Sequence, residues 1–270
     1  MSEHIFDLRG THNPHRWYLP LGPHLCVGPT GGEFMFGGIG LAAAVAAMER
    51  TTGRPVVWAT AQYLSYAKLG SVVDFDVWTP TQGKYNTQAR VIGHVDDREI
   101  ITVNAALGSR PAEAVHQWET MPQCEAPETS RISDRWRRVD HNDLHSHLEM
   151  REPRRNEAHN GEGGRSLIWI RPAGGYPVDA AMLAIMADHV PFGVSTALGT
   201  IAGGNSLDNT IRIRRIVPTE WVLCDIQIHG VFGGFAHGSM QMFARDGELM
   251  ATGSQSLIVR DEHRLRTGPA

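Results

Sequence analysis

The stretch "GGIGLAAAVAAMERTTGR", residues 37–54, decides the fold because it is the clearest helix in the chain. Two glycines open it, strong helix formers fill it from Leu41 to Glu49, and Gly53 ends it. Four runs rich in Val, Ile, Thr and aromatic residues follow, separated by turn residues, and they predict strands at residues 55–67, 71–81, 85–95 and 99–108. A helix followed by successive strands predicts an α+β unit in which an antiparallel sheet wraps one helix.

The second half of the chain repeats this order. A strand candidate at residues 165–172 precedes the helical segment "PVDAAMLAIMADHV", residues 177–190, which carries an apolar stripe. Strand candidates then occupy residues 206–217, 220–231, 234–244 and 248–259. Because the two helices lie 140 residues apart, the pattern indicates a domain duplication and not a solenoid array. We expect one unit at residues 1–112, a charged, Pro-rich linker at 113–140 and a second unit at 141–270.

Composition limits the classes of function. The chain has 270 residues and a formal net charge of −4, which argues against a general nucleic-acid binder. Its N-terminal residues lack the pattern of a signal peptide, and no apolar run has the length of a membrane span. Its three cysteines are odd in number and widely spaced, as in proteins of reducing compartments. We therefore expect a soluble, cytoplasmic protein that neither binds nucleic acid nor spans a membrane.

Asp208 lies where a Gly-rich loop gives way to an alternating, β-branched run. An acid beside Gly and Ser often only bonds nearby backbone N–H groups. Strand alternation supports that interpretation, because it places Asp208 on the face that carries Arg212, opposite Ile211. A catalytic role instead requires a bend that turns the carboxylate toward a site at the mouth of the strand. The residues alone leave both roles for Asp208 open.

Gln255 is more unusual, since it falls on the apolar, core-facing side of the last strand. A buried amide without hydrogen-bond partners costs about 1–3 kcal/mol. The small neighbours Ala251 and Gly253 leave room for a ligand beside it. A structural glutamine bonded to backbone is the alternative.

His229 ends a strand ahead of a Gly-rich turn, and an imidazole is chemically suited to proton transfer near neutral pH. A histidine at a strand end is nevertheless often only packed or exposed. Gly37 and Gly38 open a helix, so their backbone N–H groups are candidates, on weak evidence, for holding a substrate oxyanion.

No cofactor or metal is expected. The chain has neither a phosphate-binding glycine loop followed by Lys and Ser or Thr, nor a GxSxG elbow. A polar stretch gathers histidines and acids but lacks the spacing of a zinc site, and it reads as a solvated loop. These residues are Asp140, His141, Asp143, His145 and His147.

Several motifs, taken in order, resemble the type II acyl-CoA thioesterases, which are double hotdog enzymes. They are "LEMR" at 148–151, "IWIRPAGGYPVD" at 168–179, "LAIMAD" at 183–188, "SLDNTI" at 206–211, "EWVL" at 220–223 and "RDGELMATGSQSLIVR" at 245–260. In the first half "FMFGG", the helix after it and "GKYNTQARV" match more loosely. The resemblance implies two tandem hotdog units, each with a long helix wrapped by an antiparallel sheet.

The resemblance also implies an activity and a site. Family members hydrolyse acyl-CoA with an Asp, a Gln and a hydroxyl residue that activate a water, matched here to Asp208 and Gln255. The hydroxyl position falls on His229, a departure from the pattern that leaves open whether the imidazole replaces the hydroxyl or marks lost activity. The implied role is a thioesterase of fatty acid metabolism that forms a homodimer or higher homo-oligomer. The alternatives are a hotdog acyl-CoA hydratase or dehydratase, and a non-catalytic acyl-CoA-binding protein.

Overall fold

The computed structural model describes residues 4–133, 142–154, 163–199 and 202–261. The first half holds the long helix α1 (Gly37–Thr52) and the short 3₁₀ helix η1 (Pro23–Leu25). Its strands are β1 (Arg9–Gly10), β2 (Arg16–Pro20), β3 (Cys26–Val27), β4 (Phe34–Met35), β5 (Val56–Tyr63), β6 (Val72–Gln82), β7 (Asn86–Val95) and β8 (Arg98–Gly108). The helix and the four long strands predicted for this half are confirmed.

The second half contains η2 (Leu144–His147), α2 (Ala180–Ala187) and α3 (Phe192–Leu198). Its strands are β9 (Arg131–Ile132), β10 (Leu148–Glu152), β11 (Arg165–Pro172), β12 (Ala202–Ser206), β13 (Asp208–Ile213), β14 (Val222–Phe232), β15 (Phe235–Ala244) and β16 (Leu249–Asp261). The predicted helix at residues 177–190 is shorter than expected. Asp179 caps it by accepting the backbone N–H of Met182 at 2.9 Å, and the chain turns at Asp188.

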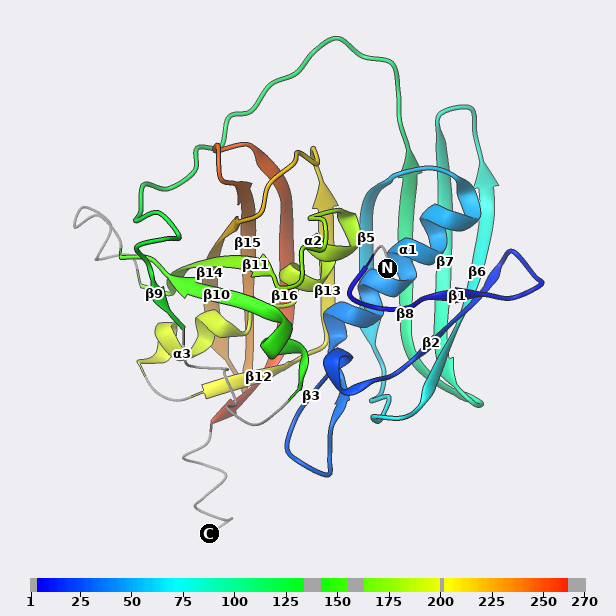
Figure 1. Cartoon of the computed structure of the whole chain (residues 1–270), viewed down its shortest axis with the longest axis horizontal. Helices are drawn as coiled ribbons and strands as arrows, with labels where there is room; N and C mark the ends of the chain where they lie inside the picture. The colour runs from blue at the N-terminus through cyan, green and yellow to red at the C-terminus, as the bar shows by residue number, and fades with distance from the viewer. Residues whose placement is uncertain (1–3, 134–141, 155–162, 200–201, 262–270) are drawn as a thin grey trace.

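Within the described residues, fourteen strands form one antiparallel sheet that continues through both halves (Figure 1). The strand order is β1-β2-β6-β7-β8-β5-β13-β16-β15-β14-β11-β10-β9, with β12 paired to β16. The halves meet where β5 pairs with β13, and the hydroxyls of Thr60 and Thr210 lie 2.5 Å apart there. Outward from this junction the order is β8, β7, β6, β2 on one side and β16, β15, β14, β11 on the other. The two halves therefore have matching strand orders.

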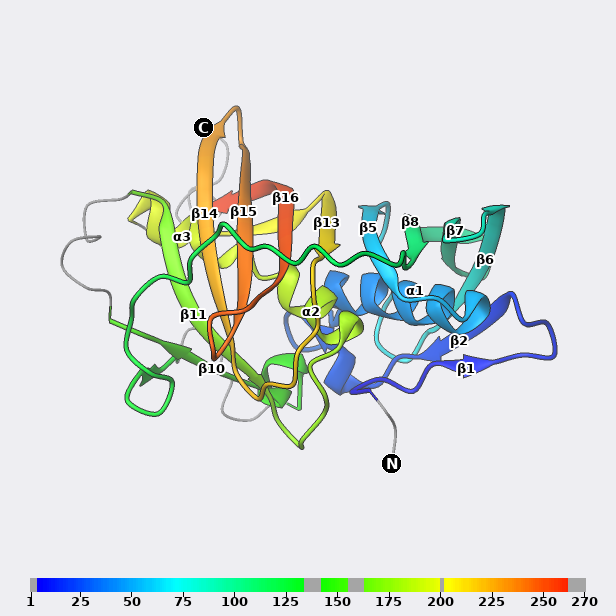
Figure 2. The same ribbon diagram turned by 90° about the horizontal axis from the view of Figure 1, so that it is seen from above.

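Helices α1 and α2 pack against each other on the inner side of this sheet (Figure 2). Ten residues between Gly38 and Ala47 in α1, and all eight residues of α2, are buried. Gly38, in the first turn of α1, lies against the C-terminal end of α2, so the two helices run in opposite directions. The apolar stripe expected for the second helix thus extends around its whole circumference, because sheet and helix cover it from every side.

The predicted linker segment packs on the outer face of the second half. Leu167, Trp169, Trp221, Leu223, Phe243 and Leu249 form a small apolar cluster there, against which Met121 and Cys124 pack. The indole N–H of Trp169 donates to the carbonyl of Glu125 at 3.0 Å. Part of this segment therefore serves as a cover for the sheet.

One helical stretch, Ala180–Leu198, is long and apolar enough to cross a membrane by length and composition alone. Two thirds of that window is buried inside the protein, as in the core helix of many soluble folds. It is therefore weak evidence for a membrane span.

Candidate active site

A buried carboxylate lies where the C-terminal end of α2 meets the N-terminus of α1. Asp188 is 5% exposed, and its Oδ2 accepts the backbone N–H of Gly38 at 2.7 Å. The first N–H groups of a helix have no partner within the helix and carry partial positive charge, so they favour an anion. A Cβ at Gly37 would lie 2.8 Å from Asp188 Oδ2, and one at Gly38 would lie 2.9 Å from the carbonyl of Ile185. The glycine pair therefore permits this close approach.

Two polar side chains from the sheet complete the cluster. Gln255 on β16, 2% exposed, donates from Nε2 to Asp188 Oδ1. The hydroxyl of Ser206, the last residue of β12, donates to the same oxygen at 3.2 Å. Gln255 Nε2 also lies 3.3 Å from Ser206 Oγ. Asp188, Ser206 and Gln255 form one connected hydrogen-bond network, which we call the Asp188 cluster.

Burial changes the acidity of this carboxylate. Removal from water raises the pKa of Asp188 from 3.8 to about 6, against the lowering effect of hydrogen bonds from Gln255, Gly38 and Ser206. The group is thus mostly ionised at neutral pH, yet it is a far stronger base than an exposed carboxylate. A perturbed acid with fixed hydrogen-bond donors is typical of a catalytic base.

Polar atoms around the cluster are left without partners among the described residues. They include Gln255 Oε1, the hydroxyl of Tyr63 and both polar side-chain atoms of Asn209. Buried polar groups normally have hydrogen-bond partners, so these atoms indicate a place that a water molecule or a polar ligand fills.

The structure brings together only some of the residues predicted from sequence. Gln255 faces the core, as expected, and belongs to the cluster. Asp208 Oδ1 instead accepts the backbone N–H of Ser256 at 2.8 Å, which is the backbone-bonded role considered for it. His229 is exposed, and its Nε2 lies 2.8 Å from Ser239 Oγ. No hydrogen bond between described residues joins Asp208 or His229 to Gln255, so of the three predicted residues only Gln255 belongs to the Asp188 cluster.

Asp188 and Ser206 were not predicted from sequence as members of the site. Asp188 is an acidic residue at the C-terminal end of an entirely apolar helix. The helix dipole disfavours a negative charge at that end, and this is the signal in the sequence. A carboxylate in such a position needs a specific donor, and Gly38 supplies it. Ser206 lies two residues before Asp208 in the same "SLDNTI" motif, where it was only the first residue of a predicted strand.

The predicted oxyanion glycines differ in what their N–H groups do. The N–H of Gly38 donates to Asp188 and is not available to a substrate. The N–H of Gly37, the first residue of α1, makes no hydrogen bond to a described residue.

The described part of the chain holds no group of three His, Cys, Asp or Glu side chains placed to bind a metal ion. Asp140 and His141 of the histidine-rich loop lie outside the described residues. Asp143 caps η2 through the N–H of Ser146, and His147 bonds Asn142 at 2.7 Å. These partners account for two members of the loop without a metal.

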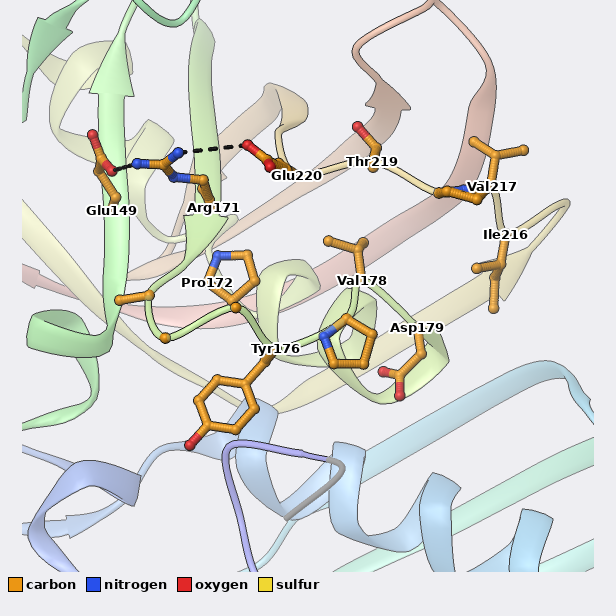
Figure 3. A pocket seen from close by; sticks show the side chains of 15 residues that line it. Glu149, Arg171, Pro172, Tyr176, Val178, Asp179, Ile216, Val217, Thr219 and Glu220 are labelled. Atoms are coloured by element: carbon orange, nitrogen blue, oxygen red, sulfur yellow. Dashed lines mark hydrogen bonds and ion pairs between the residues drawn. The ribbon is translucent and has the colours of Figure 1, made fainter. Parts of the chain in front are cut away.

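A cleft of about 1070 Å³ opens at the other end of α2, between the loops after β11 and β13 (Figure 3). Arg171 bridges Glu149 and Glu220 across its upper rim, and Tyr176 lies on the opposite side. No member of the Asp188 cluster lines this cleft. We place the candidate site at Asp188 because the cluster has the geometry and acidity of a reacting centre, whereas the cleft offers only space.

Comparison with known proteins decides the family. Residues 112–259 match the model of the acyl-CoA thioesterase C-terminal domain. A proposed thioesterase from Novosphingobium aromaticivorans DSM 12444 shares 35% identity, with a TM-score of 0.86 over 93% of this chain and 97% of its own. The chain belongs to the acyl-CoA thioesterase family. This thioesterase is therefore a hydrolase of thioesters.

More distant structures establish the fold. A tesB protein from Mycobacterium avium subs paratuberculosis shares 23% identity and a TM-score of 0.76, covering 94% of this thioesterase and 96% of its own chain. A hot dog fold protein of unknown function from Alicyclobacillus acidocaldarius shares 16% identity and a TM-score of 0.80, with coverage of 98% and 97%. The resemblance to a hotdog thioesterase found in the sequence is thus confirmed. No curated protein matches this thioesterase significantly.

Proposed function

We propose that this thioesterase hydrolyses acyl-CoA with Asp188 as the general base. The observation that carries the proposal is a buried carboxylate with a raised pKa, held by Gly38, Ser206 and Gln255. Asp188 takes a proton from a water, whose oxygen attacks the thioester carbonyl carbon. The C–S bond breaks, and the proton passes to the departing thiolate, which gives a free acid and CoA. General-base catalysis of this kind typically contributes about 10²–10⁴-fold.

Gln255 and Ser206 have distinct parts in this scheme. Their donor atoms fix the Asp188 carboxylate, so little reorganisation is needed when its charge changes. The unpartnered Oε1 of Gln255 is an acceptor for the second hydrogen of the attacking water. Gln255 thus keeps the role expected from sequence, whereas Asp188 and Ser206 replace Asp208 and His229 in the proposal.

A tandem double hotdog architecture supports a single site per chain. We propose units at residues 1–112 and 141–270, joined by the linker at 113–140, because the strand orders of the halves match about the β5–β13 junction. Thr60 of β5 pairs with Asn104 of β8, and the equivalent Thr210 of β13 pairs with Ser254 of β16. The residues that follow Asn104 and Ser254 are therefore also equivalent, so Ala105 corresponds to Gln255. Val56 lies four residues before Thr60, and Ser206 lies four residues before Thr210, so Val56 corresponds to Ser206. The first unit therefore has aliphatic side chains at the positions that correspond to Ser206 and Gln255.

A thiol-release assay over acyl-CoAs of several chain lengths tests the proposal. Wild type should release CoA, and Asp188→Asn and Gln255→Met should lose most of kcat. Asp208→Asn is the matched control, because it replaces a nearby carboxylate and keeps its bond to Ser256. Equal rates for wild type and Asp188→Asn would refute the assigned base.

The same assay separates the alternatives. Hydration of an enoyl-CoA without thiol release would identify a hotdog hydratase, although the exposed His229 that motivated this alternative lies outside the cluster. Thermal stabilisation by acyl-CoA without turnover would identify a binding protein.

Cellular context and assembly belong to the same proposal. Cys26, Cys124 and Cys224 are free thiols, as suits a cytoplasmic enzyme of fatty acid metabolism. A homodimer or higher homo-oligomer would cover sheet edges that are otherwise open to pairing. A monomeric mass in solution scattering would contradict the assembly, and thiols oxidised in the cell would contradict the compartment.

A further inference from the structure

The hydroxyl of Tyr63 is an unused polar group beside the Asp188 cluster. Tyr63 ends β5, and its hydroxyl oxygen is shielded from solvent with no hydrogen-bond partner among the described residues. A Cβ at Gly37 would lie 2.9 Å from Tyr63 Cζ and 2.8 Å from Asp188 Oδ2. The oxygen-bearing end of the ring, the carboxylate and the start of α1 therefore meet at one point.

A second buried polar side chain lies next to it. Asn209 is fully buried on β13, opposite Ala61 of β5, and its amide lies close enough to the Tyr63 hydroxyl to lower the pKa of that phenol. Neither group makes a hydrogen bond of normal geometry to a described residue. Buried polar groups paired this loosely destabilise a fold. Such groups persist where function requires them, because a ligand supplies the missing hydrogen bonds.

The first backbone donor of α1 belongs to Gly37, the residue in contact with both Tyr63 and Asp188. Gly38 has given its N–H to Asp188, but the N–H of Gly37 is unused among the described residues. A helix N-terminus carries partial positive charge, which favours a developing oxyanion. Tyr63 and Gly37 thus offer two donors beside the base.

We propose that Tyr63 is a further catalytic residue, whose phenol O–H and the N–H of Gly37 together bind the thioester carbonyl oxygen. As water adds to the carbonyl carbon, the C=O electron pair moves to this oxygen, and both donors stabilise its negative charge. The inference rests on the proposed acyl-CoA hydrolysis at Asp188 and adds the oxyanion site to it.

The electrostatics keep Tyr63 in the role of a donor. Burial, followed by the charge of Asp188, raises the pKa of Tyr63 well above its usual value, while Asn209 acts in the opposite direction. The charge of the Asp208 carboxylate also raises the pKa of Tyr63, as the smallest of these effects. The phenol therefore stays protonated over the pH range of any assay and cannot compete with Asp188 as the base.

Tyr63→Phe tests the inference, because it removes one oxygen and keeps the ring. Loss of one oxyanion donor should lower kcat by on the order of 10²-fold with little change in KM. The melting temperature should stay equal or rise, since the lost hydroxyl makes no well-formed hydrogen bond to a described residue. A structural tyrosine would give the opposite pair of results. Tyr85→Phe is the matched control, because Tyr85 lies away from the site beside Lys84 and Arg110.

Binding of two unreactive CoA analogues gives a readout that does not need turnover. A ketone analogue, with CH₂ inserted between sulfur and carbonyl, keeps the carbonyl oxygen, whereas an S-alkyl thioether lacks it. Tyr63→Phe should weaken binding of the ketone about 10-fold, as expected for loss of one hydrogen bond, and leave the thioether unchanged. Equal losses for both ligands, or unchanged kcat in Tyr63→Phe, would overturn the inference. If Asp188→Asn still abolishes turnover, the proposed function survives that result.

Discussion

Replacing Asp188 with asparagine should change the pH dependence of stability by a calculable amount. The folded-state pKa of Asp188 is about 6, against 3.8 for an exposed aspartate, so folding favours its protonated form. Its contribution to stability is therefore fully present below pH 3.8 and is lost as the pH rises through 6. Linkage over that range gives a loss of about 2 kcal/mol between pH 4.5 and pH 8.

An asparagine side chain does not ionise in this pH range, but it lowers the free energy of unfolding by a constant amount. The side-chain NH₂ group of the asparagine would face either the N–H of Gly38, or Gln255 Nε2 and the Ser206 hydroxyl. Either orientation leaves a buried donor unpaired, which destabilises the fold by about 1–3 kcal/mol. This cost does not depend on pH. The free energy of unfolding of Asp188→Asn, relative to wild type, should therefore rise by about 2 kcal/mol from pH 4.5 to pH 8. Urea unfolding followed by tryptophan fluorescence measures this difference.

The activity profile should report the same ionisation. Wild-type kcat/KM should fall tenfold per pH unit below 6 and level off above it, because only the carboxylate accepts the proton of water. Asp208→Asn should show the wild-type profile. A stability difference that is independent of pH would show that Asp188 titrates normally. A wild-type profile without an inflection near 6 would refute its role as the base.

Three further variants have defined outcomes. Ser206→Ala removes one of the hydrogen bonds to Asp188, so kcat should fall about 10-fold while the melting temperature changes little. Steady-state kinetics on any acyl-CoA that the enzyme hydrolyses checks this. The double variant Asp208→Asn, His229→Ala should keep kcat within about threefold of wild type, as expected for residues outside the site. A fall in kcat of more than about 10²-fold would favour Asp208 and His229 as the catalytic residues. Gly38→Ala should cost roughly 1–3 kcal/mol in chemical denaturation, because its Cβ would lie 2.9 Å from an α2 carbonyl, and an unchanged midpoint would contradict the helix contact.

Much of the fold was predictable because its signals are local. Helix α1 follows from an Ala-rich run that ends at Gly53, which takes the left-handed conformation as a C-cap. The four long strands of each half follow from β-branched runs between turn residues. The helix of the second half was predicted too long, since Asp179 caps it and Asp188 closes it.

The candidate site was only partly predictable. Strand alternation placed Gln255 toward the core, and the structure confirms this. The same alternation placed Asp208 on the other face, where its carboxylate bonds the backbone of Ser256. Its prediction as the catalytic acid came from the resemblance, and the geometry supports the backbone-bonded alternative.

The sequence by itself determined the main helix, the long strands and the inward direction of Gln255, because each depends on spacing within a few residues. Only the tertiary structure pointed to Asp188 as the acid that we propose for the site. Asp188 becomes a strong base because burial raises its pKa, and it remains ionisable because Gly38, Ser206 and Gln255 donate to it. These donors are 150, 18 and 67 residues away along the chain, so no local pattern contains them. Packing of α1 against α2 and the sheet brings them together.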